Sequence, residues 1–390
     1  MRSQRPADAL PGEVVDEVRE QLARTGATLT PEVVAHALRD RGRPVGDATV
    51  LAVHDRLRQD ILGAGPLEPL LRLPGVTDVL VNGPDAVYVD RGDGLEPTST
   101  RFPDDGSVRR LAQRLASSVG RRLDDATPYV DLRLPDGTRF HAVLAPLARP
   151  GTVISLRVPR ARVFTLEELA DSGTVNPDGA SLLRRLVESR LAFLVSGGTG
   201  SGKTTLLSAL LSLVDARHRM VLVEDASELR PEHPHVVGLE SRPANVEGAG
   251  EVPMRVLVRQ ALRMRPDRLV VGEVRGAEVT DLLAALNTGH EGGCGTVHAN
   301  SAGDVPARIE ALAMAAGMPQ AAVHSQLASA VGAVVHLGRH RDGTRRVAEI
   351  AVLRRESSGL VAAVPAVTFG ADGATREREG AELLGQRLRR

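Results

Sequence analysis

The sequence predicts an α/β fold that is preceded by a smaller α+β domain and a short helical segment. Two observations predict the α/β part. Helical and extended apolar runs alternate from about residue 175 to residue 340, and a glycine-rich stretch at residues 197–205 joins an apolar strand to an apolar helix. The α+β domain is predicted at residues 63–160, where short strand signals are separated by turn residues.

Composition limits the function classes. The 390 residues are enough for roughly two or three domains, and 42% apolar and 25% charged residues are typical of globular protein. Lys+Arg and Asp+Glu both number 49, so no overall positive field attracts nucleic acid or anionic lipid. The single Cys294 excludes an internal disulfide framework and fits a reducing compartment. The N-terminus runs into acidic sequence without an apolar core segment, so we expect no signal peptide. Because no 18 successive residues are apolar, we expect no membrane span.

Residues 1–62 are predicted to be helical, because apolar residues recur at helical spacing over 14–22, 33–38 and 50–57. Thr30 followed by Pro31 resembles a capped helix start, with proline at the first helical position. Two interpretations stay open for this region: an adaptor that packs on a neighbour, or a plain N-terminal extension.

The α+β domain at residues 63–160 contains a hairpin, because Pro135, Asp136 and Gly137 separate two strand-like runs and specify a reversal of the chain. The short polar stretch from Pro159 predicts a linker, which we place at residues 161–174. The predicted elements are strands at 76–81, 86–89, 129–134, 138–143 and 153–158, and a helix at 107–119.

Residues 175–370 are predicted to form a mainly parallel sheet covered by helices. Beyond Phe369 the chain is charged and rich in turn residues, so residues 371–390 are expected to be a polar tail, either frayed or a helix on the surface. The predicted helices span 178–190, 253–264 and 279–286, one more follows Lys203, and the strands span 191–195, 220–224, 269–271, 295–298, 347–353 and 360–364.

The glycine-rich stretch fits G-x-x-x-x-G-K-[ST] between a strand and a helix, which is the context that a phosphate-binding loop needs. Glycines let backbone N–H groups surround a phosphate chain, Lys203 would reach the β- and γ-phosphates, and Thr204 would offer its hydroxyl to Mg²⁺. The alternative is a glycine-rich turn that precedes a helix by chance. The residues predicted to bind a nucleoside triphosphate are Gly197, Gly198, Thr199, Gly200, Ser201, Gly202, Lys203, Thr204 and Thr205.

Acidic residues follow two strands beside this loop, where an NTPase needs groups that hold Mg²⁺ and orient water. Glu224 is the candidate for orienting the attacking water, while helix capping or ion pairing are equal alternatives for Asp225 and Glu228. Glu273 stands where a Walker B carboxylate would. Gly272 precedes it instead of the more usual aspartate, so we expect Glu273 to contact Mg²⁺ through water.

Histidines supply the last candidate group. His298 ends a strand-like segment between Thr296 and Asn300, and we predict that it senses the γ-phosphate. His290 is interpreted as structural, because a lone histidine usually is. Cys294 is interpreted as a small packing residue, since the sequence indicates no environment that would lower the pKa of its thiol.

Together these motifs resemble the secretion-superfamily ATPases that drive type II and type IV secretion and pilus assembly. The resemblance covers residues 60–355 and rests on the phosphate loop, the acidic box at 223–229, the Walker B segment at 271–276 and the histidine box at 292–300. The segments at 63–70, 76–84 and 130–137 are similar to the branch that serves tight-adherence (Flp-type) pili.

The resemblance implies a PAS-like N-terminal domain joined to a RecA-like ATPase domain, assembled as a homo-hexamer that hydrolyses ATP with Mg²⁺. It also implies an inner-membrane platform protein as partner and a cytoplasmic location at the inner face of the membrane. Arg133 and Arg157 match the family arginines that reach the phosphates, and a guanidinium supplied across a closing cleft would neutralise the transferring phosphoryl group. The alternative is that both are surface strand residues.

Two departures from the family pattern matter. The chain lacks the four-cysteine module of some type II ATPases, so no zinc is expected, and Glu224-Asp225-Ala226 replaces the Glu-Asp-Pro form of several relatives, which leaves the working acid open. Two other functions remain as hypotheses: a nucleotide-gated scaffold with little turnover, and a conjugative ATPase that moves nucleic acid. The absence of Trp, with only two Tyr and five Phe, gives little sign of base-stacking surfaces.

Overall fold

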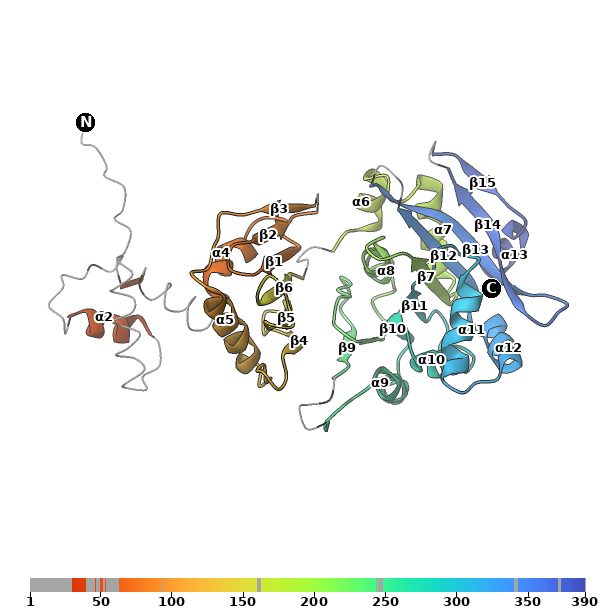
Figure 1. Cartoon of the computed structure of the whole chain (residues 1–390). Coiled ribbons are helices and arrows are strands. Elements are labelled where there is room, and N and C mark those ends of the chain that lie inside the picture. The colour runs from red at the N-terminus through yellow and green to blue at the C-terminus, as the bar shows by residue number, and fades with distance from the viewer. Residues whose placement is uncertain are drawn as a thin grey trace, which may run out of the picture. The chain divides into compact units, whose positions relative to one another are not determined.

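The computed structural model describes residues 30–39, 46, 50–51, 53, 63–92, 94–159, 163–242, 244, 248–339, 343–370 and 373–389. The chain divides into two compact units, Met1–Arg160 and Ala161–Arg390, called here the front unit and the phosphate-loop unit (Figure 1). Each is described by itself.

One helix of the predicted N-terminal region is described, α2 (Pro31–Arg39). Pro31 is its first residue, and the Thr30 hydroxyl accepts a hydrogen bond from the Val33 N–H at 3.4 Å, so the predicted helix start is confirmed. The other helices predicted within residues 1–62 lie outside the described residues, apart from Val50, Leu51 and Val53, which are helical.

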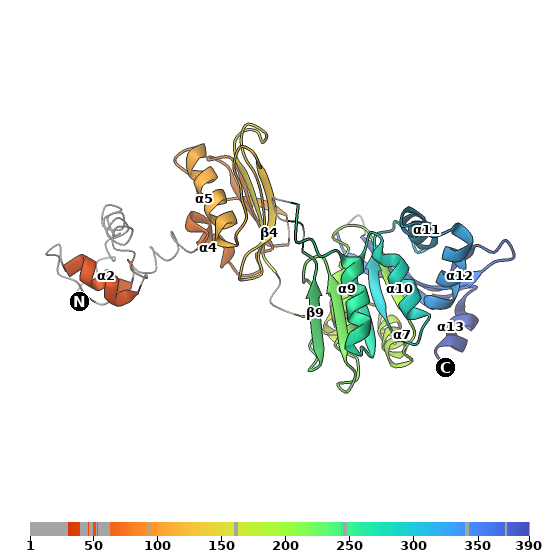
Figure 2. The same ribbon diagram turned by 90° about the horizontal axis from the view of Figure 1, so that it is seen from below.

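The front unit contains a six-stranded antiparallel sheet with the strand order β3-β2-β1-β6-β5-β4. Along its strands alternate residues are buried, so one face packs on a core around Phe140, Ile154 and Leu156. The elements are η1 (Gly65–Leu67), α4 (Glu68–Leu71), β1 (Asp78–Asn82), β2 (Val87–Asp90), β3 (Leu95–Pro97), α5 (Asp105–Ser118), β4 (Tyr129–Arg133), β5 (Arg139–Val143) and β6 (Val153–Arg157). Figure 2 shows α4 and α5 on the same side of this sheet.

The predicted hairpin is confirmed as β4 and β5, which pair antiparallel. Its turn depends on Gly137, which has a φ of +89°, and on Asp136, whose carboxylate accepts a hydrogen bond from the Thr138 N–H at 2.9 Å. The assignment of this unit to a PAS-like fold stays a prediction.

The phosphate-loop unit contains a nine-stranded sheet with the order β15-β14-β13-β12-β7-β11-β10-β8-β9. From β12 to β9 all neighbours are parallel, which confirms the predicted mainly parallel sheet, whereas β13, β14 and β15 add antiparallel strands. The strands are β7 (Phe193–Gly197), β8 (Met220–Glu224), β9 (Val236–Glu240), β10 (Arg268–Val274), β11 (Cys294–Val297), β12 (Ala333–Arg339), β13 (Arg345–Arg355), β14 (Val361–Phe369) and β15 (Thr375–Glu377).

Helices cover both faces of this sheet. In β7, Phe193 and Val195 belong to one core, whereas Leu194 between them belongs to a second core on the other face. The first core is completed by α6 (Leu166–Asp171), α7 (Pro177–Glu188), α8 (Lys203–Leu211) and α13 (Ala381–Arg387), and the second by α9 (Met254–Ala261) with η2 (Leu262–Met264), α10 (Glu278–Leu286), α11 (Val305–Ala315) and α12 (Gln320–Ala330).

The predicted linker at 161–174 is wrong, because it contains α6. A capping box starts this helix: the Thr165 hydroxyl accepts from the Glu168 N–H at 3.1 Å, and the Glu168 carboxylate accepts from the Thr165 N–H at 3.0 Å. Leu166 and Leu169 then point into the first core, where they are 1% and 5% exposed. Polar residues between these leucines hid a helix that packs on the sheet.

The polar tail expected at 371–390 needs a similar correction. Residues 375–377 form the edge strand β15, and α13 follows it. Leu384 is only 2% exposed and belongs to the first core, while the Arg387 guanidinium donates to the carbonyl oxygen of Leu353 at 2.7 Å. The expectation of a helix was correct, but this helix is anchored to the sheet and not frayed.

Candidate functional site

The phosphate loop, defined here as residues 198–202, connects β7 to α8. A Cβ atom at Gly197, just before it, would lie 2.6 Å from the carbonyl oxygen of Leu337, and Gly202 has a φ of +97°, so neither position suits a side chain. The backbone can therefore wrap round an anion at the positive end of α8. Among the described residues, the buried Ser201 hydroxyl has no hydrogen-bond partner, and an oxygen atom of a phosphate would satisfy it.

Lys203 is the only lysine of the chain, because every other one of its 49 basic residues is an arginine. Its side chain is 7% exposed, and its Nζ atom donates to the carbonyl oxygens of Gly197 at 3.0 Å and Gly198 at 2.9 Å. Burial lowers the pKa of Lys203, whereas the charges of Glu273 and Glu228 raise it. A compact ammonium fits between these carbonyls, which a planar guanidinium does not.

His298 lies between Lys203 and Glu273. Its Nε2 atom is 2.5 Å from Glu273 Oε1, and its Nδ1 atom is 3.4 Å from Lys203 Nζ. A neutral ring with its hydrogen on Nε2 makes both contacts, because it donates to the carboxylate and accepts from the ammonium. Burial and the charge of Lys203 lower the pKa of His298, which favours this neutral form, while Glu273 raises it.

Arg275 extends these contacts to the acidic box. Its guanidinium lies 2.8 Å from Asp225 Oδ2 and 3.4 Å from Glu273 Oε2. Side-chain contacts therefore join five residues one after another, and we call this set the charge network: Lys203, His298, Glu273, Arg275 and Asp225. It joins side chains from all four motifs that the sequence indicated.

Two members of this environment were missed at the sequence level. Arg275 follows Glu273 by two residues, so it lies on the same side of the strand path, a signal that could have identified it. The charge of Arg308, on α11, lowers the pKa of His298, but Arg308 had no sequence motif that marked it.

Glu224 ends β8 and is 4% exposed. Its Oε1 atom accepts hydrogen bonds from the backbone N–H groups of Glu228 at 3.0 Å and Leu229 at 2.9 Å, so it holds the turn after β8. Burial raises the pKa of Glu224 to about 7, although these two N–H groups act to lower it. Its Oε2 atom accepts no hydrogen bond from the described residues and lies outside the charge network.

Gly272 makes room for Glu224. A Cβ atom at Gly272 would lie 2.6 Å from Glu224 Cγ. The Glu224 side chain, from the neighbouring strand β8, therefore fills the space that the more usual aspartate would need at position 272. We expect Gly272→Ala to lower the free energy of unfolding by about 1–3 kcal/mol, because the buried Glu224 must move. Urea unfolding measures this loss.

The matched control for that variant is Gly238→Ala, where the nearest atom to the new methyl group is 4.0 Å away. The double variant Gly272→Ala, Glu224→Ala should lose less stability than the sum of its single changes, because it removes the collision. Strict additivity would contradict the contact as the cause.

Thr204 and Glu273 are the residues predicted to hold Mg²⁺. Within the described parts of the chain no three His, Cys, Asp or Glu side chains gather in a way that could hold a metal ion. Mg²⁺ is commonly held by one or two protein groups together with phosphate oxygens and water. Because both Glu273 oxygens already contact His298 or Arg275, a contact through water fits this carboxylate better than a direct one.

His290 and Cys294, which precede His298 in the sequence, have structural surroundings. The Nδ1 atom of His290 lies 3.2 Å from the carbonyl oxygen of Ala285. Cys294 is 1% exposed, and burial raises the pKa of its thiol to about 12, so the thiol stays protonated and packs in the core.

Arg133 and Arg157 belong to the front unit, on β4 and β6. Arg139 on β5 lies between them, paired in register with both, so three arginines form a row across neighbouring strands. The row lies on the face opposite the core, because the residues next to Arg139 and Arg157, Phe140 and Leu156, are buried. The Arg157 Nε atom donates to Asp78 at 3.1 Å and the Arg133 Nε atom to the Gly137 carbonyl at 3.0 Å.

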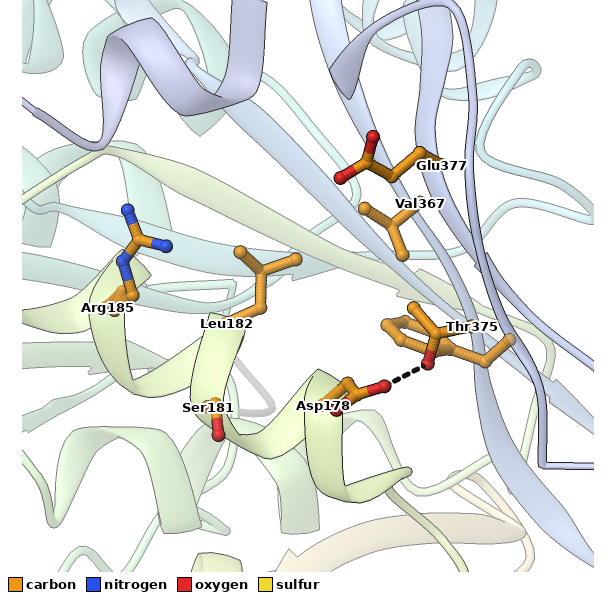
Figure 3. Close-up of a pocket in the computed structure, with 8 residues that line it drawn as sticks. Asp178, Ser181, Leu182, Arg185, Val367, Thr375 and Glu377 are labelled. Carbon is orange, nitrogen blue, oxygen red and sulfur yellow. Dashed lines mark hydrogen bonds between the residues drawn. The ribbon is translucent and has the colours of Figure 1, made fainter. Parts of the chain in front are cut away.

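A separate hollow of about 210 Å³ lies between α7 and the β14–β15 edge, lined by apolar and charged side chains (Figure 3). The Thr375 hydroxyl donates to Asp178 across it at 2.7 Å. None of its lining residues belongs to the phosphate loop or to the charge network, so it is not the predicted nucleotide site.

Within the described residues no helix has both the length and the apolar surface that crossing a bilayer requires.

Comparisons with known proteins agree with these motifs. Residues 60–376 match the profile of the family described as Type II/IV secretion system protein. A Mycobacterium tuberculosis protein with the provisional name of conjugal transfer protein is 59% identical over 326 residues, covering 82% of this chain and 92% of that protein. The type IV secretion system protein VirB11 of Brucella suis is 31% identical over 317 residues, which are 73% of this chain and 88% of that one.

Among solved structures, the Legionella pneumophila ATPase DotB has a similar fold, with a TM-score of 0.52 and 18% identity over 75% of this chain and 80% of that one. The profile match, the two relatives and the motif positions agree with one another. The chain belongs to the type II/IV secretion system protein family.

Proposed function

We propose that this protein is a motor that hydrolyses ATP, with a RecA-like domain at residues 175–370 that follows a PAS-like domain in the sequence. The observation that carries the proposal is the charge network, because it brings groups from all four motifs next to the phosphate loop. Preorganised charges of this kind stabilise a transferring phosphoryl group. The preference for adenine rests on the family resemblance.

Each residue then has a distinct task. Lys203 binds the β- and γ-phosphates, and His298 beside it senses the γ-phosphate. Glu224 Oε2 accepts a proton from the attacking water, since a carboxyl with a pKa of about 7 is suited to a general base at neutral pH. Thr204 and Glu273 hold Mg²⁺, which would neutralise charge between the β- and γ-phosphates.

We propose a homo-hexamer that passes the motion of domain closure to an inner-membrane platform protein, at the cytoplasmic face of the membrane. The front-unit segments that resemble tight-adherence pilus ATPases support a role in assembling Flp-type pili. Differential affinity of open and closed states for ATP and ADP would link hydrolysis to movement.

Phosphate release by the purified full chain, measured with Mg·ATP together with its oligomeric mass, tests this function. Turnover by a hexamer supports the motor. Tight ATP binding without turnover would contradict it and favour a nucleotide-gated scaffold.

The arginine row of the front unit supplies a further prediction. Arg133→Ala and Arg157→Ala should each lower ATP turnover by about a hundredfold or more, because a guanidinium on the transferring phosphoryl group is worth that much or more in related reactions. Arg139→Ala tests the third member of the row. Arg91→Ala, which removes an exposed arginine paired with Glu96 in the same unit, should leave turnover unchanged. Equal turnover in all four variants would exclude the row from catalysis.

A second candidate function is conjugal transfer, because the 59% identical M. tuberculosis protein carries that name. Turnover that rises with added single-stranded DNA, and loses this stimulation between 50 and 200 mM salt, on the order of what phosphate contacts produce, would favour it. Turnover indifferent to DNA favours pilus assembly.

A further inference from the structure

Arg345 begins β13 close to the phosphate loop. Its cross-strand partner is Arg339 on β12, and two residues earlier on that strand Leu337 pairs with Gly197. A Cβ atom on Gly202 would lie 3.8 Å from both Arg345 Cδ and Leu337 Cδ2, so the stem of Arg345 passes beside the last glycine of the loop.

The charge of Arg345 has no counterpart in the described structure. Its Nε atom is buried without a hydrogen-bond partner, and within the described part of the chain no carboxylate forms an ion pair with Arg345. The residue opposite, Arg339, is a second cation. A guanidinium stays charged at any ordinary pH, and leaving its buried Nε–H group without a partner is costly. An anion bound at this place would remove that cost.

The sheet order indicates which part of a nucleotide that anion belongs to. Glu273 lies on β10, and His298 directly follows β11. In the order of the sheet both of these strands lie on one side of β7, whereas β12 and β13 lie on the other side. A triphosphate whose γ-phosphate contacts Lys203 and His298 therefore extends across the loop towards β13. Its opposite end is the α-phosphate.

We propose that Arg345 binds the α-phosphate of the nucleotide held by the phosphate loop. This inference rests on the proposed function and assigns a residue to the end of the nucleotide that ATP and ADP share. A bidentate guanidinium contact to a phosphate is among the stronger hydrogen-bonded pairs in proteins.

The test is Arg345→Met, which keeps the apolar stem beside Gly202 and removes the charge. Calorimetry with Mg·ADP and with a non-hydrolysable ATP analogue should show both affinities falling by the same factor, about tenfold to a hundredfold. The thermal midpoint without nucleotide should stay equal or rise, because a buried N–H group without a partner is removed. Arg345→Lys should recover part of the ADP affinity.

The matched control is Arg346→Met, whose side chain points to the other face of the sheet and which should bind ADP like the wild type. Wild-type ADP affinity in Arg345→Met would overturn the inference alone. A loss confined to the ATP analogue would also overturn it, because it would place Arg345 at the γ-phosphate. Wild-type protein that binds no ADP would overturn the proposed function together with it.

Discussion

Lys203→Ala is expected to lower ATP turnover at least about a thousandfold, because it removes the ammonium that the carbonyls of Gly197 and Gly198 hold at the phosphate loop. Lys203→Arg is expected to lower ATP turnover as well. The space between the Gly197 and Gly198 carbonyls holds a point charge, and the wider guanidinium would have to displace the loop. Phosphate release under saturating Mg·ATP measures both variants.

The control for Lys203 is a cation that stays at the surface of the same unit. Arg217→Ala removes a guanidinium whose ion-pair partner among the described residues is Asp215, and should turn over ATP at the wild-type rate. Normal turnover in Lys203→Ala would remove the basis of the nucleotide site. Folding of each variant is checked by its thermal midpoint, so that lost turnover is not confused with lost structure.

Glu224→Gln is expected to lower turnover by about a hundredfold or more and to leave ATP binding intact. The amide keeps an oxygen for the N–H groups of Glu228 and Leu229, so the turn after β8 should persist. Because a base works only when ionised, wild-type turnover should rise with pH through about 7, the pKa of the buried carboxyl. Wild-type turnover in Glu224→Gln would transfer the role of base to another acid, with Glu273→Gln as the next variant.

The same substitution should change stability in a pH-dependent way. Burial raises the folded-state pKa of Glu224 from 4.5 to about 7, so the folded state holds the proton over that interval and loses stability as pH rises through it. At pH 8 Glu224→Gln should therefore have a higher free energy of unfolding than the wild type, by up to about 3 kcal/mol, which urea unfolding measures. At pH 4 the difference should vanish. A variant that is less stable than the wild type at pH 8 would contradict burial as the cause.

The elements that could be predicted from the sequence are those that a local pattern determines. The phosphate loop, the hairpin at β4–β5 and the fully buried strand β8 each depend on neighbouring residues, and β8 has the predicted bounds. β10 was predicted too short, because Gly272 and Glu273 interrupt its apolar run although both lie in the strand.

The parts that could not be predicted depend on contacts between distant residues. Arg275 and Asp225 are fifty positions apart, and no periodicity shows that they meet. The sequence marks Gly272 as unusual, but only the packing of Glu224 against it explains why a side chain is excluded there. In α6 the polar Glu168 caps the start of the helix, and in β12 the polar His336 forms a hydrogen bond with Ser196. These polar residues interrupt the apolar pattern from which the two elements would be predicted.

The use of a single lysine has a consequence beyond phosphate binding. Amine-reactive reagents and lysine-modifying enzymes can act on a side chain of this protein at only one position, Lys203, which directly follows the phosphate loop. Acylation of that amine would remove its charge and inactivate the molecule in one step, and a bound nucleotide would shield it. The extent of labelling at one atom would thus report directly how much of the protein is occupied.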